Sequence, residues 1–203
     1  GKSVAGGLVA TLNNNTGDYS PNNTSSPLAG NLDPNEQPVR LTVSGRAAQF
    51  TAANSEYFSG GDVLDIGTDD FSLAFWLYID TLGQFGIINK RDRASATNLG
   101  YAVESQSDGT LDLLLSDGTS VTTISSTTVM SAGTWYFCVV TADRSGNGQW
   151  YINAGSAEGA ADITSQNGTL ANAIAFQVGA GYSASADRFY GGRMVSVAVW
   201  TKL

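Results

Sequence analysis

Residues 132–155 read AGTWYFCVVTADRSGNGQWYINAG, two apolar runs separated by a short polar stretch. In the first run the apolar side chains alternate in two sets, one of which is Trp135, Phe137 and Val139. A period of two is typical of a β-strand, whose successive side chains point to opposite faces. We therefore predict two strands joined through the polar stretch DRSGNG at 143–148.

The polar stretch is similar to the first half of an EF-hand calcium loop. Oxygen-bearing residues and a glycine occupy the first, third, fifth and sixth loop positions: Asp143, Ser145, Asn147 and Gly148. An EF-hand also needs flanking helices and a glutamate at its last position, where this chain has Ala154. The stretch is better explained as a hairpin loop, with Asp143 capping the turn and Gly146 and Gly148 supplying positive φ. A partial role in metal binding is the remaining alternative.

The strand pattern continues on the N-terminal side of this hairpin. Residues 71–79, FSLAFWLYI, place alternate large apolar side chains on one face and Trp76 and Tyr78 on the other. A strand that is apolar on both faces is expected at the centre of a sheet, with its second face under a loop or in a binding cleft.

Two Asp-Gly-Thr repeats, at 108–110 and 117–119, separate three further alternating runs within about 99–126. Asp-Gly between such runs is a strong hairpin signal, because both turn positions favour positive φ. The runs predict a three-stranded meander, and the whole pattern predicts an all-β protein, a sandwich of two antiparallel sheets.

Residues 13–38 differ in composition, since asparagine, proline, serine and threonine dominate and no periodicity survives. We interpret this segment as a long irregular loop. Apolar runs lie on both sides of it, GLVATL at 7–12 and VRLTV at 39–43. We therefore predict one β-sandwich domain over residues 1–203 that contains this loop.

Net charge and hydropathy exclude two classes of partner. The chain has 203 residues and a formal net charge of -8. An acidic surface repels phosphate backbones and anionic lipid, so we expect no nucleic-acid partner. No apolar stretch approaches the length of a transmembrane helix, so we expect no membrane insertion.

Several segments together resemble the laminin-G-like, or concanavalin-A-like lectin/glucanase, jelly-roll family over about residues 7–200. The most specific likeness is the opening segment, where Gly-x-Trp precedes an apolar strand, an Asp-led turn and Tyr-x-Asn. It departs from the family where Asn153 is followed by Ala154 instead of glycine. Other matching segments follow in family order: GLVATL, GDYSPNN, GRAAQF, DDFSLAFWLYI, FGIINKRD, FQVGAG and FYGGRMVSVAVW. The resemblance implies two curved antiparallel sheets packed as a jelly roll.

The residues that catalysis would need are missing. The chain has no histidine, which removes Ser-His-Asp and Cys-His catalytic sets, and its single cysteine, Cys138, lies in an apolar run. Hydrolases of the resembled fold take their carboxylates from an E-x-D-x-E strand, which is absent here. The glutamates are well separated: Glu36, Glu56, Glu104 and Glu158. We therefore predict that the protein is not an enzyme.

The resemblance implies a non-catalytic binding module for a glycan or another extracellular surface ligand. We expect Tyr101, Tyr182 and Tyr190, which lie near glycine-rich turns, to be exposed and to bind this ligand together with Asp187 and Arg188. Strand aromatics either form a stacking platform for sugar rings or fill the core: Trp76, Tyr78, Trp135, Tyr136, Trp150 and Tyr151.

Calcium is the one cofactor that the sequence leaves open. Asp18 and Asp187 would approach each other as metal ligands if the first and last strands pair, as the resembled fold implies. A second oxygen-rich group, in DVLDIGTDD, is equally well explained as solvated turn acids: Asp62, Asp65, Asp69 and Asp70.

The alternative function is a structural or adhesion subunit of a virion, a tail fibre or a cell-surface assembly. Its motivation is a surface that is poor in charge, since charged residues make up only 14% of the chain. Such a subunit would have neighbouring subunits as partners, whereas the binding module would have a glycan or a protein surface. Both hypotheses place the protein outside the cell, on a cell surface or on a virion.

Overall fold

The computed structural model describes residues 39–41 and 47–201, and of residues 39–41 it describes only the backbone. The chain divides into two units, Gly1–Pro38 and Val39–Leu203, and the fold below is that of the second. The predicted loop at 13–38 and the predicted metal ligand Asp18 lie outside the described residues. One domain over residues 1–203 therefore stays a prediction.

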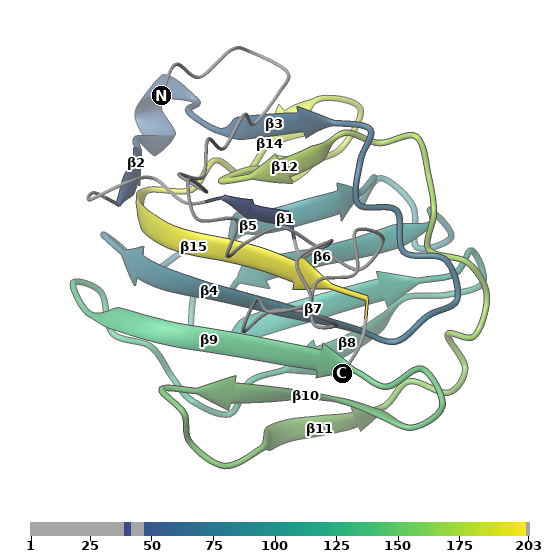
Figure 1. Cartoon of the computed structure of the whole chain (residues 1–203). Helices are drawn as coiled ribbons and strands as arrows, with labels where there is room; N and C mark the ends of the chain where they lie inside the picture. The colour runs from purple at the N-terminus through teal and green to yellow at the C-terminus, as the bar shows by residue number, and fades with distance from the viewer. Residues whose placement is uncertain (1–38, 42–46, 202–203) are drawn as a thin grey trace, which may run out of the picture. The chain divides into compact units, whose positions relative to one another are not determined.

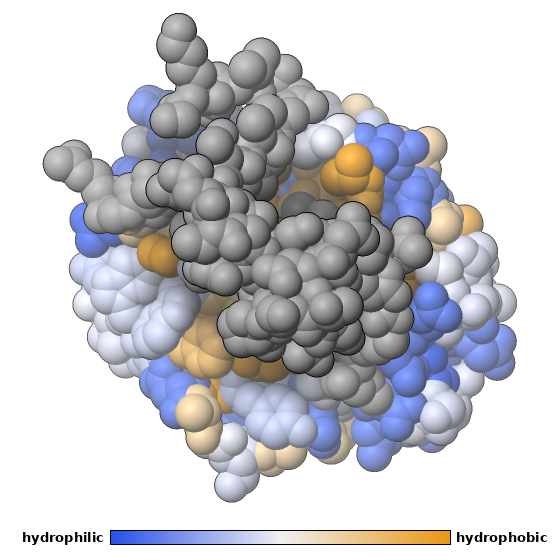
Figure 2. All heavy atoms as spheres, viewed as in Figure 1, coloured by the Kyte–Doolittle hydropathy of each residue, from blue (hydrophilic) through white to orange (hydrophobic). Residues whose placement is uncertain are grey.

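Two antiparallel sheets face each other across a shared core (Figure 1). The first has seven strands, six in the order β1 (Val39–Leu41), β15 (Gly192–Trp200), β4 (Phe71–Ile79), β9 (Trp135–Ala142), β10 (Asn147–Ile152) and β11 (Glu158–Asp162), with β2 (Ala48–Phe50) paired to β15. This sheet faces the viewer in Figure 1, and Figure 2 shows the same side with all heavy atoms.

The second sheet has six strands in the order β3 (Phe58–Gly61), β12 (Phe176–Val178), β5 (Phe85–Arg91), β6 (Gly100–Ser105), β7 (Leu111–Ser116) and β8 (Thr122–Ser125). A small separate hairpin consists of β13 (Gly181–Tyr182) and β14 (Ala186–Asp187). Within the described ranges the helical content is one short 3-10 turn, η1 (Ala52–Asn54). The two-sheet antiparallel sandwich predicted from the sequence is confirmed, and no helix in these ranges has the length and hydropathy of a membrane span.

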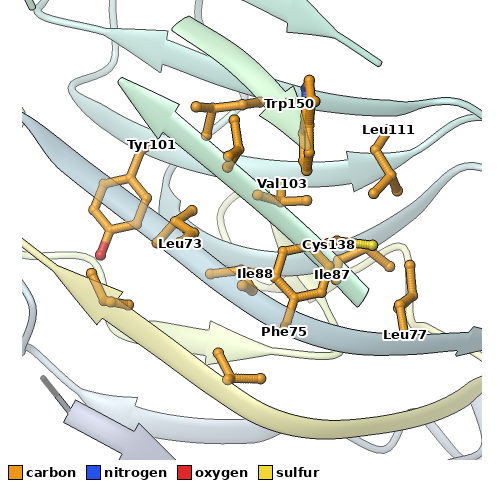
Figure 3. Close-up of a cluster of buried hydrophobic side chains, with 14 of the residues drawn as sticks. Leu73, Phe75, Leu77, Ile87, Ile88, Tyr101, Val103, Leu111, Cys138 and Trp150 are labelled. Atoms are coloured by element: carbon orange, nitrogen blue, oxygen red, sulfur yellow. The ribbon is translucent and has the colours of Figure 1, made fainter. Parts of the chain in front are cut away.

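The core fills the space between the sheets with alternate side chains of each strand. On β4, Leu73, Phe75 and Leu77 are 0% exposed and meet Val103 of β6 and other side chains of the second sheet (Figure 3). Trp150 also lies there, and its indole N–H donates to the Ile124 carbonyl at 2.8 Å. Each such side chain contributes about 1.5–3 kcal/mol by leaving water, so this layer dominates the stability of the sandwich.

The opening segment forms the predicted hairpin, β9 to β10, and its loop needs no metal. The Asp143 carboxylate accepts from the backbone N–H of Ser145 at 2.9 Å and from its hydroxyl at 2.7 Å. The prediction of positive φ at Gly146 and Gly148 is wrong, because neither adopts it. Space requires the second glycine instead, since a Cβ at 148 would lie 2.7 Å from Ile124 Cγ1.

The predicted meander is confirmed as β6, β7 and β8. Positive φ occurs only at the glycine of each Asp-Gly pair, with 89° at Gly109 and 98° at Gly118. The aspartates Asp108 and Asp117 instead accept hydrogen bonds from the backbone two residues later. The turn therefore has one left-handed position where we predicted two.

Candidate functional site

Two of the predicted ligand-binding tyrosines belong to the interior. Tyr101 and Tyr190 are both 0% exposed, so the prediction that they reach solvent is wrong. The Tyr101 hydroxyl donates to the Leu64 carbonyl at 2.9 Å, and the Tyr190 hydroxyl donates to the Tyr78 carbonyl at 2.6 Å. Burial raises the pKa of both phenols, and these carbonyls satisfy them. Both side chains anchor loops to strands.

The other three predicted residues lie together on the β13–β14 hairpin and its end. Tyr182, Asp187 and Arg188 are each half-buried. Asp187 Oδ2 lies 2.5 Å from Arg93 Nη2, and Arg188 forms an ion pair with Glu104 of β6. The structure adds Arg93 and Glu104 to these three residues, and sequence reasoning did not join them to the hairpin because they are distant from it in the chain.

Of the two predicted calcium ligands, only Asp187 lies among the described residues. Asp187 is neutralised by Arg93, and Asp18 lies outside the described part. Of the aspartates at 62–70, Asp62 and Asp65 face the fully buried Lys90 ammonium at 2.5 and 3.2 Å. They are ion-pair partners of Lys90, and their side chains remain 55% and 44% exposed. The described residues contain no group of three or more acidic or cysteine side chains suited to a metal ion.

The strand aromatics separate cleanly by sheet face. Trp150 belongs to the core, whereas Trp76 and Tyr78 of β4 lie on the outer face of the seven-stranded sheet. The β4–β9 register places Trp76 opposite Phe137 and Tyr78 opposite Trp135. The result is two adjacent rows of paired rings. Tyr151 of β10 lies beyond β9, opposite Val139, on the same outer face. We call these five aromatic residues the aromatic face.

Four of the five rings of the aromatic face are in contact as two pairs, and all five are partly open to solvent. Ring centroids lie 5.2 Å apart for Trp76 and Phe137 and 5.3 Å apart for Tyr78 and Trp135. Trp76 is 41% exposed, and the other four residues of the aromatic face are half-buried. Outside the grey atoms, Figure 2 shows apolar and weakly polar surface on this side of the molecule, with hydrophilic residues mainly toward its rim. Partly exposed aromatic rings that gather on one face make this face a candidate recognition surface.

Polar groups border the aromatic face on both sides. Arg193 lies over the Tyr78 ring, with its guanidinium carbon 4.7 Å from the ring centroid, and its Nε donates to the Gln49 side chain at 2.8 Å. On the other side, the Gln149 amide donates to the Tyr151 hydroxyl at 2.6 Å. An apolar floor with hydrogen-bonding edges suits a ligand that presents both C–H groups and hydroxyls.

The fold and the sequence agree on the family of the protein. The family profile described as the concanavalin A-like lectin/glucanases superfamily matches residues 51–203. This is most of the chain, and the chain belongs to that family. No curated protein matches the chain in sequence.

Solved structures share the fold at low sequence identity. The chain is similar to the binding domain of Paraclostridial Mosquitocidal Protein 1, with 14% identity, a TM-score of 0.63, and coverage of 83% of this chain and 44% of that one. It is also similar to the botulinum neurotoxin serotype D ligand-binding domain in complex with N-acetylneuraminic acid, with 12% identity, a TM-score of 0.57, and coverage of 82% and 43%. The chain therefore spans less than half the length of either toxin domain.

A third similar structure is the native heptameric SAP-like pentraxin from Limulus polyphemus. Its identity is 15% and its TM-score 0.55, with 84% of this chain and 78% of that chain covered. At these identities the likeness concerns the fold.

Proposed function

We propose that the protein is a non-catalytic binding module that recognises a glycan through the aromatic face. The observation that carries the proposal is the pair of contacting aromatic rows, in which Trp76 remains 41% exposed on an otherwise well-packed sheet. Sugar rings present C–H faces that stack on such rings. Gln49, Gln149 and Arg193 border the rows and can exchange hydrogen bonds with hydroxyls.

The proposal that the protein is non-catalytic is supported by the state of one pair of facing carboxylates. Glu104 and Asp112 are opposite each other on β6 and β7. Glu104 is paired with Arg188, and Asp112 accepts from Gln106 Nε2 at 2.7 Å and from the Ser125 hydroxyl at 2.6 Å. A glycosidase needs one carboxyl as acid and one as free nucleophile or base. Both carboxylates here are engaged by protein groups.

Two similar structures add support for ligand binding outside the cell. Both toxin structures are described as binding domains, and one of them contains N-acetylneuraminic acid. We propose by analogy an extracellular or surface-exposed location and a glycan or protein-surface ligand for this chain. We keep a structural calcium ion as a proposal that depends on Asp18, because the other predicted ligand, Asp187, is paired with Arg93.

The test is titration with a broad oligosaccharide panel, followed by calorimetry and repeated with and without calcium. We expect at least one glycan to bind, and we expect Trp76→Ala to weaken it by about tenfold, because losing ~1.4 kcal/mol of stacking corresponds to that factor. Phe58→Ala is the matched control, since Phe58 is 42% exposed but lies in the six-stranded sheet.

The result that would reject the glycan hypothesis is no binding across the panel in either condition. A Trp76→Ala variant that binds as well as the unmodified chain would remove the aromatic face from it. Light scattering tests the alternative of an assembly subunit, which predicts a stable oligomer that Trp76→Ala disrupts and Phe58→Ala does not.

A further inference from the structure

A second polar surface lies on the outer face of the six-stranded sheet. The register aligns Gln177 of β12, Asn89 of β5 and Ala102 of β6 in one row. Arg91 lies two residues from Asn89 on β5, and Glu104 lies two residues from Ala102 on β6. We call Gln177, Asn89, Arg91 and Glu104 the polar strip. The opposite face of these strands carries Tyr101 and Val103 into the core, so the strip is separate from it.

The polar strip is buried, although no residue of the described ranges satisfies its centre. Its four side chains are between 1% and 4% exposed. Both side-chain atoms of Asn89, Oδ1 and Nδ2, lack a hydrogen-bond partner, and so does Oε1 of Gln177. Burying an amide group that has no hydrogen-bond partner costs free energy, and such groups are rare in native proteins. Three such atoms on neighbouring strands therefore indicate a place for a molecule that supplies hydrogen bonds.

The β13–β14 hairpin packs on β5 beside the strip, and it is hydrogen-bonded to Gly86 of β5 and to Arg93 just beyond that strand. The Arg93 N–H donates to the Tyr182 carbonyl at 3.0 Å, and the Gly86 N–H donates to the Arg188 carbonyl at 2.9 Å. A Cβ at Gly86 would lie 2.0 Å from the Gly181 nitrogen, so the β13–β14 hairpin rests directly on β5. The hairpin is further held by the ion pairs Arg93–Asp187 and Arg188–Glu104.

The β13–β14 hairpin is a candidate for opening. The hairpin is held by two backbone hydrogen bonds and two ion pairs. The Arg93–Asp187 pair is partly exposed, and such pairs are individually weak, whereas Arg188–Glu104 joins a partly exposed arginine to a buried carboxylate. Two of its residues, Ala184 and Arg188, adopt positive φ of 65° and 44°, a conformation that is costly for residues with a Cβ. Segments of this kind open locally at less cost than the sheets they cover.

The unpaired atoms define the chemistry of the missing partner. Two of them accept and one donates, so the partner must both donate and accept hydrogen bonds at neighbouring positions. Hydroxyl groups do both. The charged groups around the strip are engaged within the protein. Arg93 and Arg188 pair with Asp187 and Glu104, and Arg91 donates to the carbonyls of Asn98 at 3.1 Å and Ser95 at 2.8 Å, which favours a partner without net charge. We propose that the polar strip is a second binding site, for a small neutral polyhydroxylated molecule such as one sugar unit, enclosed by the β13–β14 hairpin.

The test uses the whole 203-residue chain and the probes glucose, galactose and myo-inositol, measured by calorimetry and by amide hydrogen exchange. We expect at least one probe to bind and to slow exchange in residues 181–188. We expect Asn89→Leu to weaken this binding about tenfold or more, because it removes two of the three unpaired atoms at nearly constant volume.

Asn89→Leu should fold as well as the unmodified chain or better, because an apolar side chain has no hydrogen bonds to lose. Asn167→Leu, at an exposed asparagine, is the matched control and should bind normally. Trp76→Ala should also bind these probes normally, which separates this site from the aromatic face. Binding that persists in Asn89→Leu, or ordered water alone in the strip with no probe bound, overturns the proposal.

Discussion

Glu104 shows how one buried carboxylate can link the fold to pH. The residue is 4% exposed. Burial raises the pKa of its carboxyl above the ordinary 4.5, although the nearby Arg188 and Arg93 act to lower it. Protonation is therefore easier in the folded chain than in the unfolded one. By linkage, its stabilising contribution is fully present below pH 4.5 and is lost as the pH rises through the folded pKa.

Replacing Glu104 by glutamine should remove this dependence. We expect the free energy of unfolding of Glu104→Gln, relative to the unmodified chain, to rise as the pH increases through the folded pKa, because glutamine does not ionise. Urea unfolding of both proteins at a series of pH values measures it. Asp162→Asn is the control of opposite sign, because hydrogen bonds from the backbone and hydroxyl of Thr164 lower the pKa of Asp162. A difference that falls with rising pH in Glu104→Gln would contradict the assignment.

At the scale of elements, the β9–β10 hairpin depends on a contact with a strand of the other sheet. Gly148 is the second residue of β10 and lies opposite Ala142, and a Cβ there would lie 2.7 Å from Cγ1 and 3.1 Å from Cδ1 of Ile124 on β8. Ile124 is 0% exposed and cannot move aside into solvent. The glycine therefore sets how closely the two sheets approach at this end.

Gly148→Ala should destabilise the protein by about 1–3 kcal/mol, the usual cost of overpacking a core. The denaturant midpoint should fall with an unchanged slope. Gly67→Ala is the matched control, because a Cβ at 67 meets nothing within 4 Å and Gly67 does not adopt positive φ. Equal midpoints for the two variants would show that the contact with Ile124 does not limit the approach of the sheets.

At the scale of the whole molecule, the space between the sheets is closed to solvent around Cys138. This residue is the single cysteine of the chain, it lies in the middle of β9, and it is 0% exposed. Burial raises the pKa of its thiol far above the ordinary value, so the reactive thiolate is suppressed. A reagent can reach it only when the sheets separate.

Cys138 should therefore report the opening of the sandwich. We expect a maleimide or disulfide reagent to label the native chain only at the rate of global unfolding, and to label it completely in denaturant. Mass spectrometry of samples taken over time measures the rate. Rapid labelling under native conditions, at a rate independent of denaturant, would show a local opening beside β9.

Much of the architecture could be predicted because its signals are local. The period of two in 71–79 and 135–142 predicted β4 and β9, and Asp-Gly at 108–109 and 117–118 predicted the meander. Exposure of single residues could not be predicted in the same way. Tyr101 and Tyr190 sit beside glycines in the chain, yet carbonyls 37 and 112 residues away hold their hydroxyls in the interior.

The same distinction between local signals and long-range contacts holds for the candidate sites. The sequence supplied the aromatic residues and the hairpin residues Tyr182, Asp187 and Arg188. It did not show that Trp76 pairs with Phe137 outside the sandwich while Trp150 fills it, because that depends on which strands are neighbours. The unpaired Asn89 was not foreseen, since an asparagine in FGIINKRD carries no local sign of what covers it.

The sequence alone determined the main strands, the places of the turns and the family resemblance, because side-chain alternation and turn residues act over a few neighbouring positions. The tertiary structure decided which faces are dry, which aromatic rings meet and which buried polar atoms remain without partners. Those properties follow from strand order and register, which join residues far apart in the chain.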